Sequence, residues 1–213
     1  AALSLLVLSS NAWAQSTKRL IDEVNPFIGT SNFGTTNPGA VVPNGLMSIT
    51  PFNVSGSPEL NKFDKDKRWW STPYTADNKF FSGFSHVNLS GVGCPELGSI
   101  IVSASTGDLD VDYTHYGSAM SQEKAHPGYY SVQLDKHKIK AEVTATQRTA
   151  VSAFTFERGG KSNILVNLGL GLTNESGATV RFLNDSTIVG SKLMGTFCYA
   201  PQAVFNQYFA IRI

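Results

Sequence analysis

Hydrophobic and polar residues alternate along much of the second half of the chain, at the two-residue period of a β-strand. In residues 139–146, four apolar side chains alternate with four polar ones. Strand side chains point alternately to the two faces of a sheet, so this pattern predicts a strand with one buried and one solvated face. Residues 129–134 also alternate, and the polar turn 135–138 joins the two segments. They are therefore predicted to pair as an antiparallel hairpin.

Short apolar or alternating segments continue along the chain, with turn residues between them. Further strands are expected at 41–50, 99–105, 150–157, 163–170, 179–182, 186–190, 194–199 and 204–213. Helical periodicity is absent over any stretch of about 12 residues. The pattern predicts an all-β fold, an antiparallel β-sandwich or else a barrel. Residues 209–213 resemble the middle of a strand, so we expect a domain truncated at this end.

Composition fits one exported domain. Charged residues make up 15% of the 213-residue chain, below the roughly 25% usual for soluble domains, while 41% are hydrophobic. The net charge is +1, and the densest basic cluster, residues 62–68, is interrupted by Asp64 and Asp66. A phosphate-tracking surface needs clustered Lys and Arg, so nucleic acid is not an expected partner.

The first residues have the pattern of a cleaved leader. An apolar run at 1–8 is followed by the small-x-small sequence Ala12-Trp13-Ala14. This is typical of a signal peptide, of which residues 1–14 are interpreted as a remnant, with the domain at 15–213. The run is shorter than the roughly 20 residues that span a bilayer, so no membrane contact is expected after the leader is removed. The alternative is a buried helix at the start of the fold.

The two cysteines, Cys94 and Cys198, leave two possibilities open. Export permits a disulfide, but the sequence gives no distance between the two residues. Because Cys94 lies in a Gly-rich turn and Cys198 in an apolar strand, two separate buried thiols are the favoured interpretation.

Two Gly-rich segments, residues 25–51 and 81–98, carry the candidate chemistry. Neither has a nucleotide-binding pattern, and the four histidines lack metal-ligand spacing. Gly lets a ligand approach the main chain, and Ser, Asn and His offer neutral hydrogen bonds that suit sugar hydroxyls. The pair Trp69-Trp70 adds flat apolar surface of the kind that stacks on a pyranose ring. The alternative is tight β-turns with core aromatics.

These segments resemble the N-terminal domain of glycoside hydrolase family 92, bacterial exo-acting α-mannosidases. The motif N-P-F-I-G-T at 25–30, followed by N-P-G-A at 37–40 and P-N-G-L-M at 43–47, is similar to the opening of the family. The motif G-F-S-H-V-N-L-S-G-V-G-C at 83–94 resembles its most recognisable N-terminal sequence. A-H-P-G-Y-Y at 125–130 and N-I-L-V-N-L-G at 163–169 follow in the same order.

The resemblance implies a secreted or periplasmic bacterial enzyme that cleaves α-mannosidic linkages of glycans with inversion and depends on Ca²⁺. In the family, a β-sandwich is joined to a larger α-helical toroid, which is absent here and holds the catalytic carboxylates and most of the Ca²⁺ site. No catalytic residue or metal ligand is therefore expected in this chain. By resemblance, the sugar-lining residues are His86, Asn88, Ser90, Gly93, Cys94, Trp69 and Trp70. Many members have a second His in place of Asn88, which leaves the linkage specificity open.

Two further functions are compatible with the residues. One is a carbohydrate-binding module that acts without a second domain, and the other is a structural sandwich of a surface protein. A reading frame that continues beyond Ile213 into a helical domain would favour the enzyme over both.

Overall fold

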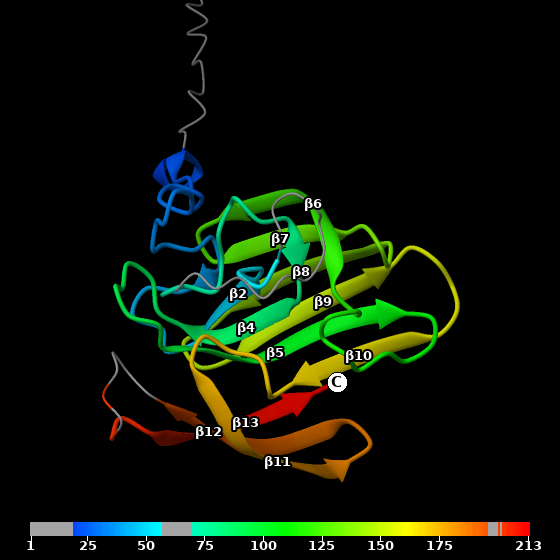
Figure 1. Cartoon of the computed structure of the whole chain (residues 1–213). Coiled ribbons are helices and arrows are strands. Elements are labelled where there is room, and N and C mark those ends of the chain that lie inside the picture. The colour runs from blue at the N-terminus through cyan, green and yellow to red at the C-terminus, as the bar shows by residue number, and fades with distance from the viewer. Residues whose placement is uncertain (1–18, 57–69, 196–199, 201) are drawn as a thin grey trace, which may run out of the picture.

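The computed structural model describes residues 19–56, 70–195, 200 and 202–213 and consists of three antiparallel sheets. A short 3₁₀ helix, η1 (Leu20–Glu23), precedes them. Figure 1 shows two sheets packed face to face and the third set beside the first. Within the described residues, no helix is long and apolar enough to cross a membrane. The predicted leader, 1–14, lies outside the described residues.

The first sheet has the order β1-β2-β4-β5-β10 and carries the Gly-rich motifs. Its strands are β1 (Ala40–Val41), β2 (Ser48–Phe52), β4 (Gly83–Asn88), β5 (Leu97–Thr106) and β10 (Ser162–Asn167). The second sheet has the order β3-β6-β7-β8-β9. Its strands are β3 (Phe80–Phe81), β6 (Ser118–His126), β7 (Tyr129–Leu134), β8 (Ile139–Ala145) and β9 (Ala150–Phe156).

The main core fills the space between these two sheets. Ile49, Phe84 and Ala104 from the first sheet join Tyr130, Val132 and Val143 from the second. Phe84 lies edge-on to Phe81, with 4.9 Å between ring centroids. Edge-to-face packing of buried aromatic rings stabilises a pair beyond the area that it buries. The predicted antiparallel β-sandwich is confirmed.

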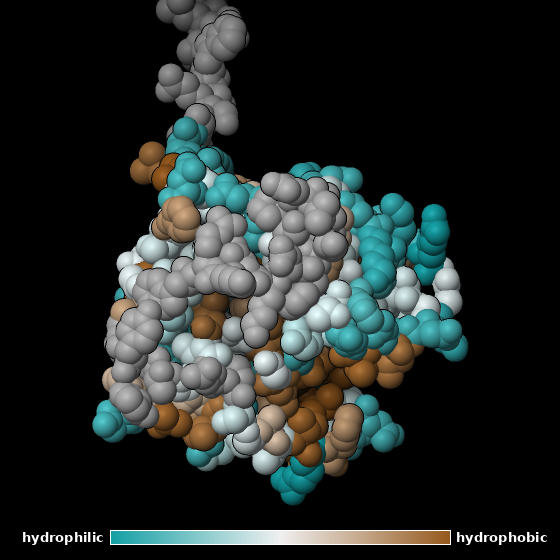
Figure 2. Space-filling model, in the orientation of Figure 1, coloured by the Kyte–Doolittle hydropathy of each residue, from teal (hydrophilic) through white to brown (hydrophobic). Residues whose placement is uncertain are grey.

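The third sheet is formed by β11 (Asn174–Asn184), β12 (Thr187–Gly195) and β13 (Phe205–Arg212), in that order. It meets the first sheet where Ser99 Oγ hydrogen-bonds Gln207 Oε1 and lies 3.3 Å from the Met194 sulfur. Figure 2 shows apolar side chains on the lower part of the molecule, where Figure 1 places β10, β11 and β13. Large exposed apolar residues of this sheet are Val180, Phe182, Leu183, Phe205 and Tyr208.

The predicted hairpin at 129–146 is confirmed as β7 and β8, which pair in register from Tyr129↔Thr144 to Leu134↔Ile139. Three expectations were wrong in detail. The strand predicted at 41–50 is interrupted by a turn in which Gly45 N donates to Val42 O. The strands predicted at 186–190 and 194–199 share β12, and residues 196–199 lie outside the described part. The strands β3, β4 and β6 were not predicted.

Candidate functional site

The two Gly-rich segments lie side by side and are joined by hydrogen bonds. Gly91 N donates to Thr35 O at 2.7 Å, and Asn37 Nδ2 donates to Leu89 O at 3.2 Å. We call residues 29–39 and 88–98 the paired loops. A Cβ on Gly34 would lie 1.8 Å from Gly29 O, so the first loop can close only with glycine at that position. The structure thus brings together two motifs that are about fifty residues apart.

His86 lies on β4, between Ile49 of β2 and Ser99 of β5. Its Nδ1 is 2.7 Å from Ile100 O, so Nδ1 carries the proton and donates to this carbonyl. Burial lowers the pKa of the imidazole, which favours the neutral ring. Nε2 then presents a lone pair, and nothing in the described residues donates to it. A neutral imidazole fixed in this tautomer can accept a hydrogen bond from a hydroxyl group.

Asn88 is held by the protein itself. Its Oδ1 accepts a bond from Ser85 Oγ at 2.8 Å, its Nδ2 donates to Ser85 O at 3.0 Å, and its backbone N donates to Ser48 Oγ at 2.6 Å. These bonds close the end of β4 and set the start of the second paired loop. The structure therefore gives Asn88 a positioning role in the loop, and its amide has little capacity left for a ligand.

Ser90, Gly93 and Cys94 lie on the second paired loop. Ser90 and Gly93 are exposed, and the space beside the Gly93 α-carbon is open, with no atom within 4 Å of a Cβ built there. Cys94 is half-buried and disulfide-bonded. The expectation of two separate thiols is wrong for Cys94, because its sulfur is bonded in a disulfide and no free sulfhydryl remains. The other cysteine of the chain, Cys198, lies outside the described residues.

Trp70 is 9% exposed and packs with Phe52, Val54 and Ile101. The ring that meets solvent is Phe33, which is 67% exposed and stacks on Trp70 with 6.1 Å between ring centroids. The indole predicted to stack on a sugar thus lies beneath another aromatic ring. Trp69 lies outside the described residues.

Two buried groups had no functional prediction from sequence. Glu96, in the second paired loop, is 5% exposed; its Oε2 has no hydrogen-bond partner, and burial raises its pKa. His137 was expected in an exposed turn. The turn is present, but the ring is buried, with Nε2 2.8 Å from Tyr116 O and Nδ1 3.3 Å from Thr106 N. His137 is therefore a structural residue.

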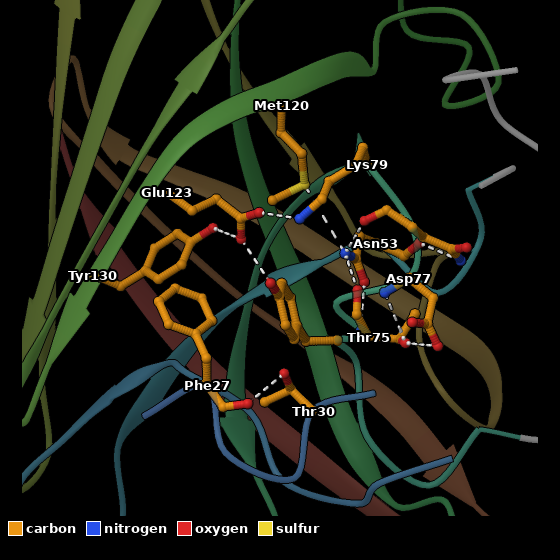
Figure 3. Close-up of polar contacts among 11 residues, drawn as sticks. Phe27, Thr30, Asn53, Thr75, Asp77, Lys79, Met120, Glu123 and Tyr130 are labelled. Carbon is orange, nitrogen blue, oxygen red and sulfur yellow. Dashed lines mark hydrogen bonds and ion pairs between the residues drawn. The ribbon is translucent and has the colours of Figure 1, made fainter. Parts of the chain in front are cut away.

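A polar cluster around Glu123 ties β6 to its neighbours (Figure 3). The carboxylate accepts hydrogen bonds from Tyr74 Oη at 2.7 Å, Tyr130 Oη at 2.9 Å and Lys79 Nζ at 2.6 Å. Burial beside this carboxylate raises the pKa of both phenols. Figure 3 shows Lys79 and Tyr130 directed at the carboxylate of Glu123, and the three hydrogen bonds indicate a structural role for this side chain. The cluster has no signal in the sequence, because the polar residues of β6 hide its alternation.

Within the described residues, no three His, Cys, Asp or Glu side chains are grouped closely enough to hold a metal ion. The Ca²⁺ expected from the resemblance thus finds no fitting ligand set here, and we assign no residue of this chain to it.

Comparison with known proteins agrees with this arrangement of motifs. The sequence profile described as "Glycosyl hydrolase family 92 N-terminal domain" matches residues 23–213. The chain belongs to glycoside hydrolase family 92. The family 92 domain also resembles a protein of Arthroderma benhamiae named "Uncharacterized secreted glycosidase", with 29% identity over 178 residues, 77% of this chain and 21% of the relative.

Solved structures give the same family and fold. A family 92 α-mannosidase of Bacteroides thetaiotaomicron is 30% identical, with a TM-score of 0.78 over 91% of this chain and 26% of that chain. Its complex with mannoimidazole matches with a TM-score of 0.77. A family 92 inverting mannosidase of the same species, 21% identical with a TM-score of 0.61, shares the fold. The family 92 domain thus spans about a fifth to a quarter of the length of these relatives.

Proposed function

We propose that this domain lines the sugar pocket of a secreted exo-acting α-mannosidase that hydrolyses α-mannosidic linkages of glycans with inversion. The match of residues 23–213 to the family 92 N-terminal domain carries the proposal. The mannoimidazole complex of a 30% identical relative supports a mannose-containing substrate. The secreted relative supports export. A Ca²⁺ requirement and a bacterial source rest on the family resemblance alone.

The paired loops support a pocket-lining role. They present exposed backbone at Ser90 and Gly93, and His86 Nε2 supplies a neutral acceptor beside them. Inversion needs an acid and a base carboxyl about 6.5–9.5 Å apart. Glu123, whose side chain is 10% exposed, is engaged by three donors, and Glu96 is a single buried carboxyl that cannot supply both groups. We therefore assign the acid and the base to a part of the protein outside this domain. In the α-mannosidase relative, this domain corresponds to 26% of the chain.

The proposal is tested in the full-length protein with α-linked mannobiose as substrate. We expect His86→Ala to lower kcat/KM at least about tenfold. A site that binds a hydroxyl group loses much of its transition-state binding when the hydrogen-bond acceptor is removed. His115→Ala is the control, since His115 is exposed and pairs only with Asp110 and Asp112 within the described residues.

Three outcomes decide among the candidates. Mannose release by the full-length protein that is abolished by chelation and restored by Ca²⁺ supports the whole proposal. Release by the 213-residue chain alone would contradict the assignment of the acid and base elsewhere. Binding of mannobiose without hydrolysis by the full-length protein would favour a carbohydrate-binding module.

A further inference from the structure

The strand β5 carries a β-bulge opposite His86. Phe84 of β4 pairs with Val102 of β5. Two residues later, His86 pairs with Ser99, which lies three residues back along β5. Between these two pairs, β5 therefore holds one more residue than β4. A bulge leaves its extra residue outside the ladder and bends the strand, and bulges are frequent beside active sites.

The bulge contains a residue in a conformation that its side chain disfavours. Ile100 has a φ angle of 51° and is 5% exposed. A β-branched residue at positive φ is an outlier, because its Cβ crowds the backbone. Val87, which follows His86 on β4, has a φ angle of 58°. Two strained residues thus adjoin His86, one on its own strand and one on the facing strand, and such strain is concentrated at functional positions.

The carbonyl group of Ile100 is directed at His86. In an extended residue, the carbonyl lies near the plane of the sheet and joins the ladder, whereas the left-handed conformation turns it away from that direction. Ile100 O lies 2.7 Å from His86 Nδ1, which donates to it. Free imidazole prefers the proton on Nε2, so this bond selects the less common tautomer and leaves Nε2 as an acceptor.

A second bulge in the same protein provides a comparison. On β6, the register also shifts between Ser121 and Lys124, and Gln122 has a φ angle of 52°. Gln122 is exposed and polar, whereas Ile100 is buried and β-branched. The left-handed conformation is thus present at Ile100 in spite of its side chain, which indicates a requirement for the backbone at this position.

We propose that Ile100 is a positioning residue for His86: its left-handed bulge aims the carbonyl oxygen at Nδ1 and keeps Nε2 as the acceptor for a sugar hydroxyl group. The inference rests on the proposed function and adds to it the residue that sets the tautomer of the acceptor. It requires the backbone of Ile100 and no contact between its side chain and the sugar.

The test compares two changes at this position in the full-length protein, with α-linked mannobiose as substrate. Deletion of Ile100 removes the extra residue and its carbonyl contact, so kcat/KM should fall at least about tenfold. Ile100→Gly keeps the bulge, because Gly adopts positive φ without strain, and kcat/KM should stay within about threefold of the wild type. Loss of the buried side chain should nevertheless lower the Tm of this variant.

A double variant separates positioning from general damage to the fold. In the His86→Ala background, deletion of Ile100 should lower kcat/KM by less than about twofold further, since both changes remove the same contact. An equal loss on deletion with and without His86 overturns the inference and assigns the bulge to packing of the third sheet, which Ser99 contacts.

The tautomer of His86 can be measured without an assay of activity. The 213-residue chain contains four histidines, and in ¹⁵N-histidine NMR spectra the signal missing from His86→Ala identifies His86. We expect Nδ1–H in the wild type and in Ile100→Gly, and Nε2–H in the deletion variant. The Nε2–H tautomer in the wild type overturns the inference, and this outcome can be read even if the deletion variant does not fold.

Other results distinguish this inference from the proposed function. An active wild type whose kcat/KM is unchanged by deletion of Ile100 overturns the positioning role alone. A kcat/KM of Ile100→Gly as low as that of His86→Ala also overturns it, because the side chain and not the bulge would then be required. If the wild type cleaves no α-mannoside, the proposed function fails, and the tautomer of His86 in the three proteins decides the positioning role by itself.

Discussion

His137 shows how one buried side chain can join elements that are distant in the sequence. It lies in the turn between β7 and β8, and its ring bridges the carbonyl of Tyr116 and the backbone N–H of Thr106. Burial lowers the pKa of the imidazole, so the folded state favours the neutral ring that can donate from Nε2 and accept at Nδ1.

We expect His137→Ala to destabilise the domain by about 1–3 kcal/mol, because it removes the partner of a buried carbonyl and of a part-buried N–H. The free energy of unfolding from urea titration at pH 7.5 measures the effect. His126→Ala, which removes an exposed ring stacked on Tyr129, provides the comparison and should change stability little. Equal stabilities of the two variants would contradict the structural role of His137.

Glu96 is a buried carboxyl whose Oε2 lacks a partner, and desolvation raises its pKa in the folded state. A raised folded-state pKa means that the fold favours the protonated acid. The stability that this group contributes is therefore present at low pH and lost as pH rises through the raised pKa.

The variant Glu96→Gln carries a neutral side chain of similar shape at every pH. We expect its Tm relative to the wild type to increase between pH 4 and pH 8, because only the wild type acquires a buried charge over this range, chosen around the usual Glu pKa of about 4.3. Differential scanning calorimetry at several pH values measures the difference. A Tm difference that is independent of pH would show that Glu96 ionises freely in the folded state.

At the scale of elements, β6 is a polar strand that is fixed by one internal carboxylate. Its residues alternate between buried and exposed positions along Ser118–His126, but serine, lysine and glutamate hide the pattern in the sequence. Glu123 joins the strand to Tyr130 on β7 and to Tyr74 and Lys79, which precede β3. A buried charge with three donors stabilises one arrangement of these segments.

We expect Glu123→Ala to cost about 3 kcal/mol, because it removes the acceptor of two phenols and leaves Lys79 without its ion pair. Glu142→Ala is a matched control, since Glu142 also accepts from a tyrosine and a lysine, Tyr129 and Lys140. Glu142 lies on the wet face of β8, where ion pairs contribute little. Similar losses of Tm for both variants would indicate that burial does not determine the strength of the Glu123 cluster.

For the whole molecule, the third sheet shows where the described domain lacks a covering layer. In the pairing register, Phe182 lies opposite Ile188, which lies opposite Ile211, so the three share one face. Ile188 is 8% exposed, whereas Phe182 is 72% exposed. The exposed apolar part of this face is Val180 and Phe182 on the outer strand β11, 53% and 72% exposed, and exposed apolar surface of this kind marks an interaction site. The relatives are about four times as long as this domain, so we expect the rest of the protein to cover this face.

The variant Phe182→Asp distinguishes a covered face from a free one. In the 213-residue chain, it should leave the free energy of unfolding within about 0.5 kcal/mol, because the ring is already exposed. In the full-length protein, it should lower Tm, since a charge would be buried against an apolar partner. Val151→Asp on the exposed side of β9 should affect neither protein. A dimer of the short chain that dissociates in Phe182→Asp would instead assign the face to a second copy.

The sequence by itself determined the fold class, the hairpin of β7 and β8, and the family. Alternation defines a strand wherever one face is apolar and the other polar, as in residues 139–145, and motifs in a fixed order carry the family. These signals are local, so they survive without knowledge of distant contacts.

Only the tertiary structure decided the pairing of the two Gly-rich loops, the burial of Trp70 beneath Phe33 and the fixed tautomer of His86. It also showed that Asn88 is held by Ser85 and Ser48. Each depends on partners far away in the sequence or on irregular backbone, and residue type does not encode them. An aromatic or polar residue takes either role, ligand contact or packing, according to the neighbours that the fold brings to it.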